Sequence, residues 1–349
     1  MGEHGPAPGS VRGPRACAPL PRAFPLPAGS RSGGSTMHPD RKDLLGLEPL
    51  APEEIQEILD RARPFLPALQ RPTTLPQPLR GRLAVNLFYE PSTRTRNSFE
   101  LAARRLGAEV INMGAAGSSV QKGESLIDTG RTLDAMGADF IVIRHASSLA
   151  PELMARSVAA GVVNAGDGAH EHPTQALLDL LTLQEAFGSV KGLNVVIVGD
   201  ILHSRVARSD LWGLTKLGAR VTLVGPPTLL PAAFEALGAR TAHRLDPLLP
   251  HADVLYMLRI QRERQQGGLF PSLEEYRELY ALDGRRLQML PRNARILHPG
   301  PANLGVEITE EVVGDPRALI HDQVRSGVAV RMAVLEMLAE RRGVRAISA

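Results

Sequence analysis

The chain has 349 residues, of which 43% are hydrophobic and 22% are charged, proportions typical of a globular protein of about two domains. No segment approaches the ~20 consecutive apolar residues of a membrane-spanning helix, so we expect no membrane association and a cytoplasmic location. The formal net charge of +3 lies in residues 1–36, so the remaining chain is neutral and nucleic acid is not expected as the main partner. Cys17, the single cysteine, excludes a disulfide framework and a cysteine nucleophile in the rest of the chain.

Residues 1–36 are rich in proline, glycine and arginine and have no hydrophobic period. This composition predicts a disordered leader, or residues that precede a misassigned start, with Met37 as the alternative first residue. The segment lacks the apolar core of a secretory signal. Its excess of arginine would suit a transit peptide, but its prolines argue against the amphipathic helix of such peptides.

From residue 83 onward, short apolar runs alternate with segments of helical periodicity. The predicted strands are residues 83–88, 109–113, 140–144, 161–165, 193–198, 220–225, 253–258 and 295–298. Several intervening helices end at a glycine, namely Gly107, Gly137, Gly188 and Gly218. This alternation predicts an α/β fold with two Rossmann-like parallel-sheet domains joined by helices.

A helix over residues 172–187 ends the first predicted domain, residues 37–188. The second domain is predicted over residues 189–322. Residues 323–349 form a C-terminal segment, whose helix at about 328–341 is expected to return to the first domain.

The run Ser92-Thr93-Arg94-Thr95-Arg96 lies between a predicted buried strand and a helix. The N–H groups of a helix N-terminus are unpaired there and the helix dipole is positive, which suits an anion such as phosphate. Arginine adds bidentate donors that match phosphate oxygens. The alternative is an ordinary N-cap with solvated arginines. No Gly-rich Walker loop is present.

Two further sets of candidate binding residues lie in the first half of the chain. The loop 114–124 holds Lys122, which either delivers a cation to an anionic ligand or lies in solvent. Arg144 and His145 end a predicted strand, and ligands of open α/β sheets bind at the carboxyl ends of strands.

His172 and Gln175 lie three residues apart at a helix start, so they share one face. A neutral histidine in this position can donate a hydrogen bond to a carbonyl, and the positive helix end favours the neutral form. The alternative role for His172 is helix capping.

In the second half, Arg205 and Arg259 each follow a predicted strand, and no G-x-G-x-x-G fingerprint accompanies them, which disfavours a dinucleotide site. The segment His298-Pro299-Gly300-Pro301 is a rigid turn after the last strand.

Taken together, the Ser92–Arg96 run, Arg144-His145, His172-Pro173-Thr174-Gln175, Arg205, Arg259-Ile260-Gln261 and His298–Pro301 resemble the aspartate/ornithine transcarbamoylase family, over about residues 42–340. The aspartate-specific members are most similar. The resemblance implies an enzyme that transfers the carbamoyl group of carbamoyl phosphate to the amine of L-aspartate, in de novo pyrimidine biosynthesis, without a metal or cofactor.

The resemblance also implies residue roles. Ser92, Thr93, Arg94, Thr95 and Arg144 would hold the phosphate, and Arg94 would stabilise it as it leaves. Thr95, Arg144 and His172 would polarise the carbonyl oxygen, and Gln175 would orient the carbamoyl amide. The predicted aspartate-binding residues are Lys122, Arg205, Arg259, Gln261, Gly300 and Pro301.

Family members that act on ornithine carry a His-Cys-Leu-Pro turn, whereas this chain has His298-Pro299-Gly300-Pro301, which favours aspartate. The turn continues as Ala302-Asn303-Leu304, where the family often has an arginine. A transcarbamoylase for another amino acid such as ornithine and a non-catalytic assembly homologue are the alternatives.

The family's catalytic unit is a homotrimer with shared active sites. Lys122 and a serine of its loop, Ser119 or Ser118, would reach the neighbouring subunit's site. Regulatory or dihydroorotase-like chains are candidate partners.

Overall fold

The computed structural model describes residues 1, 41–70, 75–114, 124–260, 272–344 and 346. Residues 2–36 of the predicted leader therefore lie outside the described residues, as do Gln261 and the loop residues Ser118, Ser119 and Lys122. The described residues from 41 onward belong to one compact unit, which spans residues 37–349.

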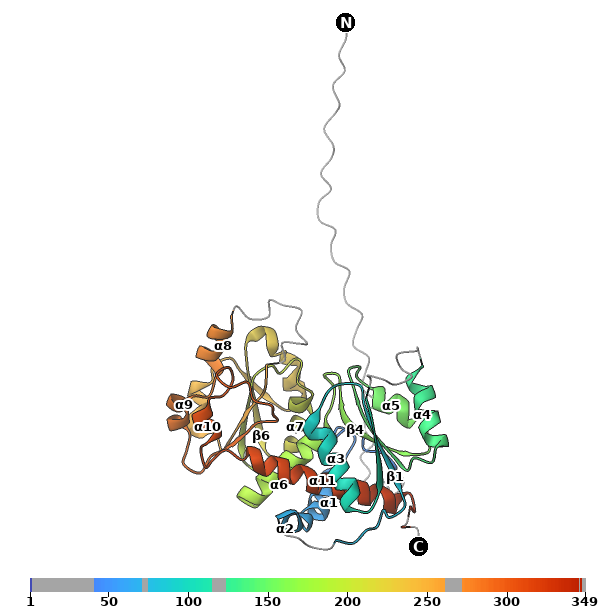
Figure 1. Cartoon of the computed structure of the whole chain (residues 1–349). Helices are drawn as coiled ribbons and strands as arrows, with labels where there is room; N and C mark the ends of the chain where they lie inside the picture. The colour runs from blue at the N-terminus through green and yellow to red at the C-terminus, as the bar shows by residue number, and fades with distance from the viewer. Residues whose placement is uncertain (2–40, 71–74, 115–123, 261–271, 345, 347–349) are drawn as a thin grey trace, which may run out of the picture. The chain divides into compact units, whose positions relative to one another are not determined.

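The first half of the unit is built on a four-stranded parallel sheet with the strand order β2-β1-β3-β4 (Figure 1). Its strands are β1 Leu83–Phe88, β2 Glu109–Gly114, β3 Phe140–His145 and β4 Gly161–Asp167. The apolar runs of β1, β3 and β4 are almost wholly buried, as expected for parallel strands covered on both faces. β2 is the exception, since it forms an edge and is largely exposed.

The second half contains a five-stranded parallel sheet with the order β7-β6-β5-β8-β9. Its strands are β5 Asn194–Val198, β6 Arg220–Val224, β7 Arg240–Ala242, β8 Val254–Met257 and β9 Arg295–Leu297. The residues of β5 and β8 are buried, apart from the half-buried Asn194.

Helices surround both sheets. Those of the first half are α1 Pro52–Ala62, α2 Phe65–Gln70, α3 Thr93–Arg105, α4 Leu126–Ala135, α5 Ala150–Ala155 and α6 Pro173–Phe187. Those of the second half are α7 Arg205–Lys216, α8 Leu273–Tyr280, α9 Gly284–Met289 and α10 Glu310–Val313, with short 3-10 segments at Pro227–Leu229, Ala232–Leu237 and Asp246–His251. The chain ends with α11 Ile320–Arg341.

Two long helices, α6 and α11, pack against elements of both halves of the unit. α6 is apolar around most of its circumference and is buried along its length, where it packs against α7 and α11 (Figure 1). α11 also packs against α1 and α3 of the first half. The prediction of an α/β fold with two parallel-sheet domains and a returning C-terminal helix is confirmed.

The eight predicted strands match β1 to β6, β8 and β9 within two residues at each end. The four glycines predicted to end helices all have positive φ angles, between 79° and 89°. The short β7 was not predicted, because three half-buried or exposed residues carry no period. The last helix begins eight residues before the predicted start, at Ile320. The boundaries proposed for the domains stay a prediction.

No helix in the described part of the chain is long and apolar enough to cross a membrane.

Candidate active site

The strand order of each sheet brings two predicted clusters together. In the first sheet the order reverses between β1 and β3, and in the second it reverses between β5 and β8. Ligands of open α/β sheets bind at such switch points, beyond the carboxyl ends of the strands. The first switch point holds Arg94 and Arg144, since Phe88 of β1 pairs with Arg144 of β3. The second holds Arg205 and Arg259, after the paired strands β5 and β8.

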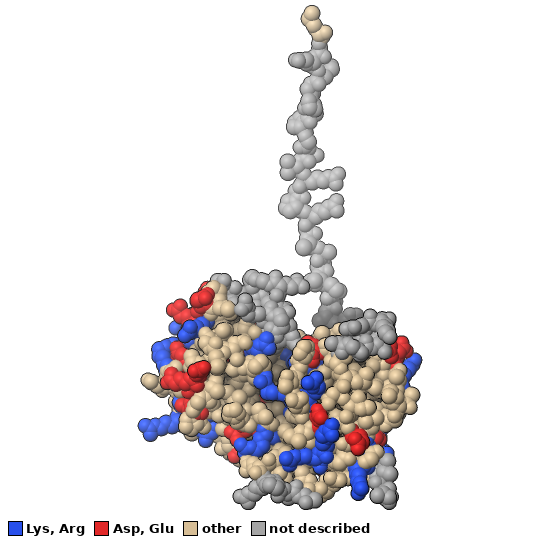
Figure 2. All heavy atoms as spheres, viewed as in Figure 1, with Lys and Arg blue, Asp and Glu red and all other residues tan. Residues whose placement is uncertain are grey.

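A cavity of about 630 Å³ joins the two switch points. Its lining includes Ser92, Thr93, Arg94, Thr95, Arg144, His172, Gln175, Arg205, Arg259, His298, Pro299, Gly300, Pro301 and Arg331. Five of these side chains are arginines, and no aspartate or glutamate among the described residues lines the cavity. Basic side chains also gather near the middle of the molecular face in Figure 2, where the two sheet-containing halves meet. The cavity therefore suits a ligand with several negative charges.

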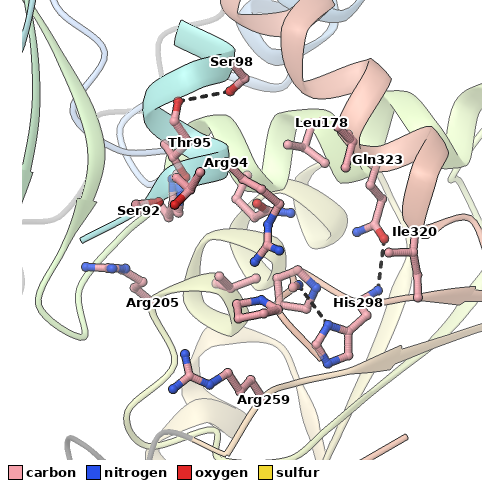
Figure 3. Close-up of a pocket in the computed structure, with 18 of the residues that line it drawn as sticks. Ser92, Arg94, Thr95, Ser98, Leu178, Arg205, Arg259, His298, Ile320 and Gln323 are labelled. Atoms are coloured by element: carbon pink, nitrogen blue, oxygen red, sulfur yellow. Dashed lines mark hydrogen bonds between the residues drawn. The ribbon is translucent and has the colours of Figure 1, made fainter. Parts of the chain in front are cut away.

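The predicted anion site lies at the start of α3. Ser92 is the N-cap residue, and its side chain makes no capping hydrogen bond, so its hydroxyl is not used by the helix. Thr95 is buried at 8% exposure one turn into the helix. Arg94 extends from the same turn toward the segment that contains His298 (Figure 3). Its pKa is lowered by burial and then by the nearby charge of Arg259.

A carboxylate that the sequence did not single out lies beside these arginines. Glu90 Oε2 lies 3.4 Å from Arg144 Nε and 2.8 Å from the Arg205 guanidinium. Arg205 is itself buried, at 3% exposure, and also donates to the carbonyl oxygen of Gly168 at 3.4 Å. A Cβ atom at Gly166, which has a φ of +113°, would stand 2.8 Å from Arg205 Nε. Arg205 is thus an anchored side chain at the junction of the two halves.

His172 is the N-cap of α6 and is fully enclosed, at 4% exposure. It occupies the N-cap position, as the alternative expected, but its imidazole makes no capping hydrogen bond. Its pKa is lowered well below the usual value, chiefly by burial and then by the charges of Arg144, Arg205 and Arg331. His172 is therefore a neutral imidazole, able to donate one hydrogen bond to a carbonyl oxygen.

Gln175 follows on the same helix and also lines the cavity. Its side-chain Nε2 lies 3.2 Å from both carboxylate oxygens of Asp179, one helical turn further on. Asp179 in turn accepts hydrogen bonds from Tyr256 of β8 at 2.8 Å and from Gln323 of α11 at 2.6 Å. The Gln175 amide therefore binds a carboxylate that groups from β8 and α11 also bind.

The turn after β9 closes the cavity. The side chain of His298 is completely buried, with Nε2 3.2 Å from Glu307 and with Nδ1 accepting a hydrogen bond from the backbone of Gly300 at 2.8 Å. Gly300 has a φ of +61°, and a Cβ atom there would stand 2.8 Å from Cζ of Arg94. The segment 298–301 thus packs against the guanidinium of the predicted phosphate site (Figure 3).

His145 is at the strand end beside this site but has structural contacts. Its Nδ1 accepts a hydrogen bond from the backbone of Ser147 at 2.9 Å, and its ring packs edge-on against Tyr89 at 4.8 Å. Arg96, the last residue of the predicted run, is exposed and does not line the cavity.

Arg331 is a cavity residue that sequence reasoning missed. It lies in the middle of α11, at 4% exposure, with its guanidinium 4.9 Å from the centre of the Phe99 ring. Burial lowers its pKa to about 10, so it remains a cation. The sequence offered one signal, a lone charge within the apolar stripe of the last helix.

Two family models match most of the chain. The model for the aspartate/ornithine carbamoyltransferase carbamoyl-P binding domain matches residues 42–185, and the model for the Asp/Orn binding domain matches residues 191–338. The chain belongs to the aspartate/ornithine carbamoyltransferase family. The two matched ranges correspond to the two sheets, so each half of the cavity comes from one of the family's domains.

Curated relatives named aspartate carbamoyltransferase catalytic subunit are similar over nearly their whole length. The subunit from Desulforamulus reducens is 57% identical over 298 residues, which cover 85% of this chain and 96% of the relative. The subunit from Moorella thermoacetica is 55% identical over 302 residues, which cover 86% and 98%.

Solved structures of aspartate transcarbamoylase from Trypanosoma cruzi have the same fold. The complex with carbamoyl phosphate has a TM-score of 0.78 at 33% identity and covers 85% of this chain and 96% of that one. The complex with carbamoyl phosphate and aspartate has a TM-score of 0.79 at 33% identity and covers 85% and 97%.

Proposed function

We propose that this chain transfers the carbamoyl group of carbamoyl phosphate to the amine of L-aspartate, which gives N-carbamoyl-L-aspartate and phosphate. The observation that supports this function most directly is the cavity with five arginines, which come from both sheet-containing halves and from α11. Carbamoyl phosphate brings a phosphate, and aspartate brings two carboxylates. The sum of these charges matches a cavity that has cationic side chains and no described carboxylate in its lining.

The residues of the first half have the chemistry to bind carbamoyl phosphate. The hydroxyls of Ser92 and Thr93 and the start of α3 would hold the phosphate oxygens, with Arg94 on the side of the 298–301 turn. Thr95, Arg144 and the neutral His172 would donate hydrogen bonds to the carbonyl oxygen. These donors stabilise the negative charge that develops on this oxygen as the amine attacks.

The protein then contributes mainly by positioning the two substrates for the reaction. The deprotonated amine of aspartate attacks the carbonyl carbon, the carbon–nitrogen bond forms, and the bond from carbon to the phosphate oxygen breaks. The attacking nitrogen loses one proton, which the leaving phosphate accepts. The phosphate leaves with its added charge stabilised by Arg94. Arg259 and Arg205, together with Gln261, Gly300 and Pro301, would orient the two carboxylates of aspartate. Arg205 would do so while it remains paired with Glu90.

The catalytic assignment is preferred over a non-catalytic assembly role because the potential donors converge on one cavity. An assembly homologue has no need of a neutral buried histidine beside buried arginines, an arrangement that is costly for stability. Aspartate is preferred over ornithine because the described lining adds no carboxylate for a cationic side chain.

We further propose a homotrimer in which each active site is completed by a neighbour. β2 is an exposed edge strand, with Ile111 40% exposed, and it leads directly into the segment that contains Lys122. No described residue between Glu109 and Ala135 lines the cavity of its own chain. Ser118 or Ser119, together with Lys122, would therefore serve the site of the adjacent subunit.

Shared sites can be tested by complementation. Lys122→Ala and Arg94→Ala chains, each inactive alone, are mixed under conditions that exchange subunits. Mixed trimers contain some sites with neither substitution, so we expect partial recovery of activity. Subunit exchange without any recovery would contradict the sharing of sites.

The product places the enzyme in de novo pyrimidine biosynthesis, and we propose a cytoplasmic location. Regulatory or dihydroorotase-like chains are proposed partners. The substrate assignment is tested by measuring phosphate release from carbamoyl phosphate with aspartate and with ornithine as acceptors. Turnover with aspartate alone is expected, and turnover with ornithine alone would overturn the assignment.

A further inference from the structure

Behind Gln175 lies a pair of buried carboxyl groups that the reaction described above does not use. Asp179 of α6 is 3% exposed and Asp210 of α7 is 1% exposed. Each carboxyl group is close enough to the other to affect its pKa. A hydrogen bond between two carboxyl groups requires a proton, because ionised carboxylates can only accept.

The surroundings indicate which carboxyl group carries that proton. The oxygens of Asp179 already accept hydrogen bonds from Gln175, Tyr256 and Gln323. The oxygens of Asp210 accept no hydrogen bond from any donor among the described residues. Three donors stabilise a negative charge on Asp179, and none stabilises one on Asp210. The proton therefore belongs on Asp210, which donates it to Asp179.

We propose that Asp179 and Asp210 hold one proton between them in the active enzyme, and that ionised Asp179 is a positioning residue that fixes the orientation of the Gln175 amide. An ionised Asp179 accepts from Gln175 Nε2, so the amide oxygen of Gln175 faces away from it, toward the cavity. An oxygen in that position can accept a hydrogen bond from the NH2 group of a carbamoyl substrate. This inference rests on the proposed function.

A second proton, bound by Asp179, would reverse the orientation of the Gln175 amide. A protonated Asp179 can donate to the oxygen of Gln175, and the amide then turns its NH2 group toward the cavity. Two NH2 groups would face each other, and the hydrogen bond to the carbamoyl group would be lost. Burial raises the pKa of Asp179 to about 7, and burial together with the charge of Asp179 raises the pKa of Asp210 well above its usual value. The second proton therefore binds near neutral pH.

The other charged and titratable groups around Asp179 and Asp210 each keep one protonation state near neutral pH. From β8, Tyr256 has a pKa raised well above its usual value by burial and by both carboxyl groups, so its hydroxyl stays a donor. From α11, Arg331 stays a cation and attracts the charge of Asp179, while Gln323 does not titrate. At the start of α6, His172 stays neutral.

The test compares two ligands. Inorganic phosphate lacks the carbamoyl group, so its affinity does not depend on Gln175, whereas the affinity of carbamoyl phosphate does. The dissociation constants of both are measured by calorimetry with the full chain, on both sides of pH 7, and are expressed for the dianion of each ligand, because inorganic phosphate itself takes up a proton in this pH range. We expect the preference for carbamoyl phosphate over phosphate to fall about tenfold as the pH decreases through this range, since one hydrogen bond is lost. A preference that is constant with pH would overturn the proposal.

Variants separate positioning from a purely structural role. Asp179→Asn cannot titrate, so its preference should be independent of pH. Asp210→Asn replaces the shared proton with an N–H donor and should retain the preference above pH 7. Asp210→Ala removes the donor to Asp179, so the fall in preference should begin at a higher pH. An unchanged pH profile in Asp179→Asn that still binds phosphate would also overturn the proposal.

Failure of the proposed function gives a different result. A wild-type chain that binds phosphate but not carbamoyl phosphate at any pH would contradict the proposed substrate. A chain that binds carbamoyl phosphate with a constant preference would contradict only the role of the carboxyl pair.

Discussion

The guanidinium of Arg205 donates a hydrogen bond to Glu90 Oε2 at 2.8 Å, which links the first residue of α7 to the loop that follows β1. The same oxygen lies 3.4 Å from Arg144 Nε. One carboxylate thus contacts two arginines from different halves of the unit, Arg144 in β3 and Arg205 in α7. It also partly neutralises them when no substrate is bound.

Glu90→Gln should weaken this link. Arg205 has a side chain that is only 4% exposed, so loss of its counter-charge leaves a buried cation with a weaker partner. We expect the free energy of unfolding to fall by about 1–3 kcal/mol and the KM for aspartate to rise. Urea denaturation and initial rates measure the two effects. Glu152→Gln, which breaks the exposed pair of Glu152 and Arg156, is the control and should change the stability by less than about 0.5 kcal/mol.

Arg94→Ala should abolish most of the catalysis. Arg94 lies at the start of α3, where the leaving phosphate would acquire charge, and removal of such a donor typically costs about 10²–10³-fold in kcat. Arg94→Lys should recover little, because a single ammonium group cannot form two parallel hydrogen bonds to phosphate. Steady-state kinetics measure both variants. A loss confined to KM would contradict a role in the transition state.

Arg259→Ala should mainly impair the saturation of the enzyme with aspartate. Arg259 lies beyond the end of β8, in the second half of the cavity, where it would bind a substrate carboxylate. A lost charge-assisted hydrogen bond of about 1.5–3 kcal/mol corresponds to a rise in KM of about 10–100-fold. Arg156→Ala, at a surface position on α5, is the matched control. If the aspartate kinetics of Arg259→Ala match those of the control, the pocket is wrongly assigned.

The buried pair of Asp179 and Asp210 should make stability depend on pH. The folded pair keeps its protons to higher pH than the same groups in the unfolded chain, because burial raises both pKa values. The folded state therefore binds more protons above about pH 4, and this contribution to stability decreases as the pH rises. Asp210→Asn removes one such group.

The stability of Asp210→Asn relative to wild type should therefore increase with pH above about 4, by at most roughly 1.4 kcal/mol per pH unit. Denaturant unfolding at several pH values measures the difference. A difference that is constant with pH would mean that Asp210 is ionised in the folded protein.

Much of the fold could be predicted from the sequence because buried parallel strands are continuous apolar runs with clear ends. The first switch point could also be predicted in part, since Ser92–Arg96 and Arg144 each follow such a run. The sequence could not show that Arg205 is anchored by Glu90. The two residues are 115 positions apart, and no local pattern marks their pairing.

The remaining contacts depend on tertiary packing. Arg331 reaches the cavity only because α11 returns across both halves, and Asp210 meets Asp179 only because α7 packs against α6. Residues 31 positions apart in the sequence give no sign that they share a proton. The predicted roles of Ser118, Ser119, Lys122 and Gln261 rest on the sequence alone, since these residues lie outside the described structure.

The most direct test of the central claim follows the carbamoyl carbon itself. Carbamoyl phosphate labelled with ¹³C at this carbon is incubated with the enzyme and equal amounts of L-aspartate and L-ornithine, and the products are observed by NMR. We expect the label to appear in N-carbamoyl-L-aspartate, and this signal to be lost in Arg94→Ala. Label in citrulline, or no enzyme-dependent transfer to either amino acid, would contradict it.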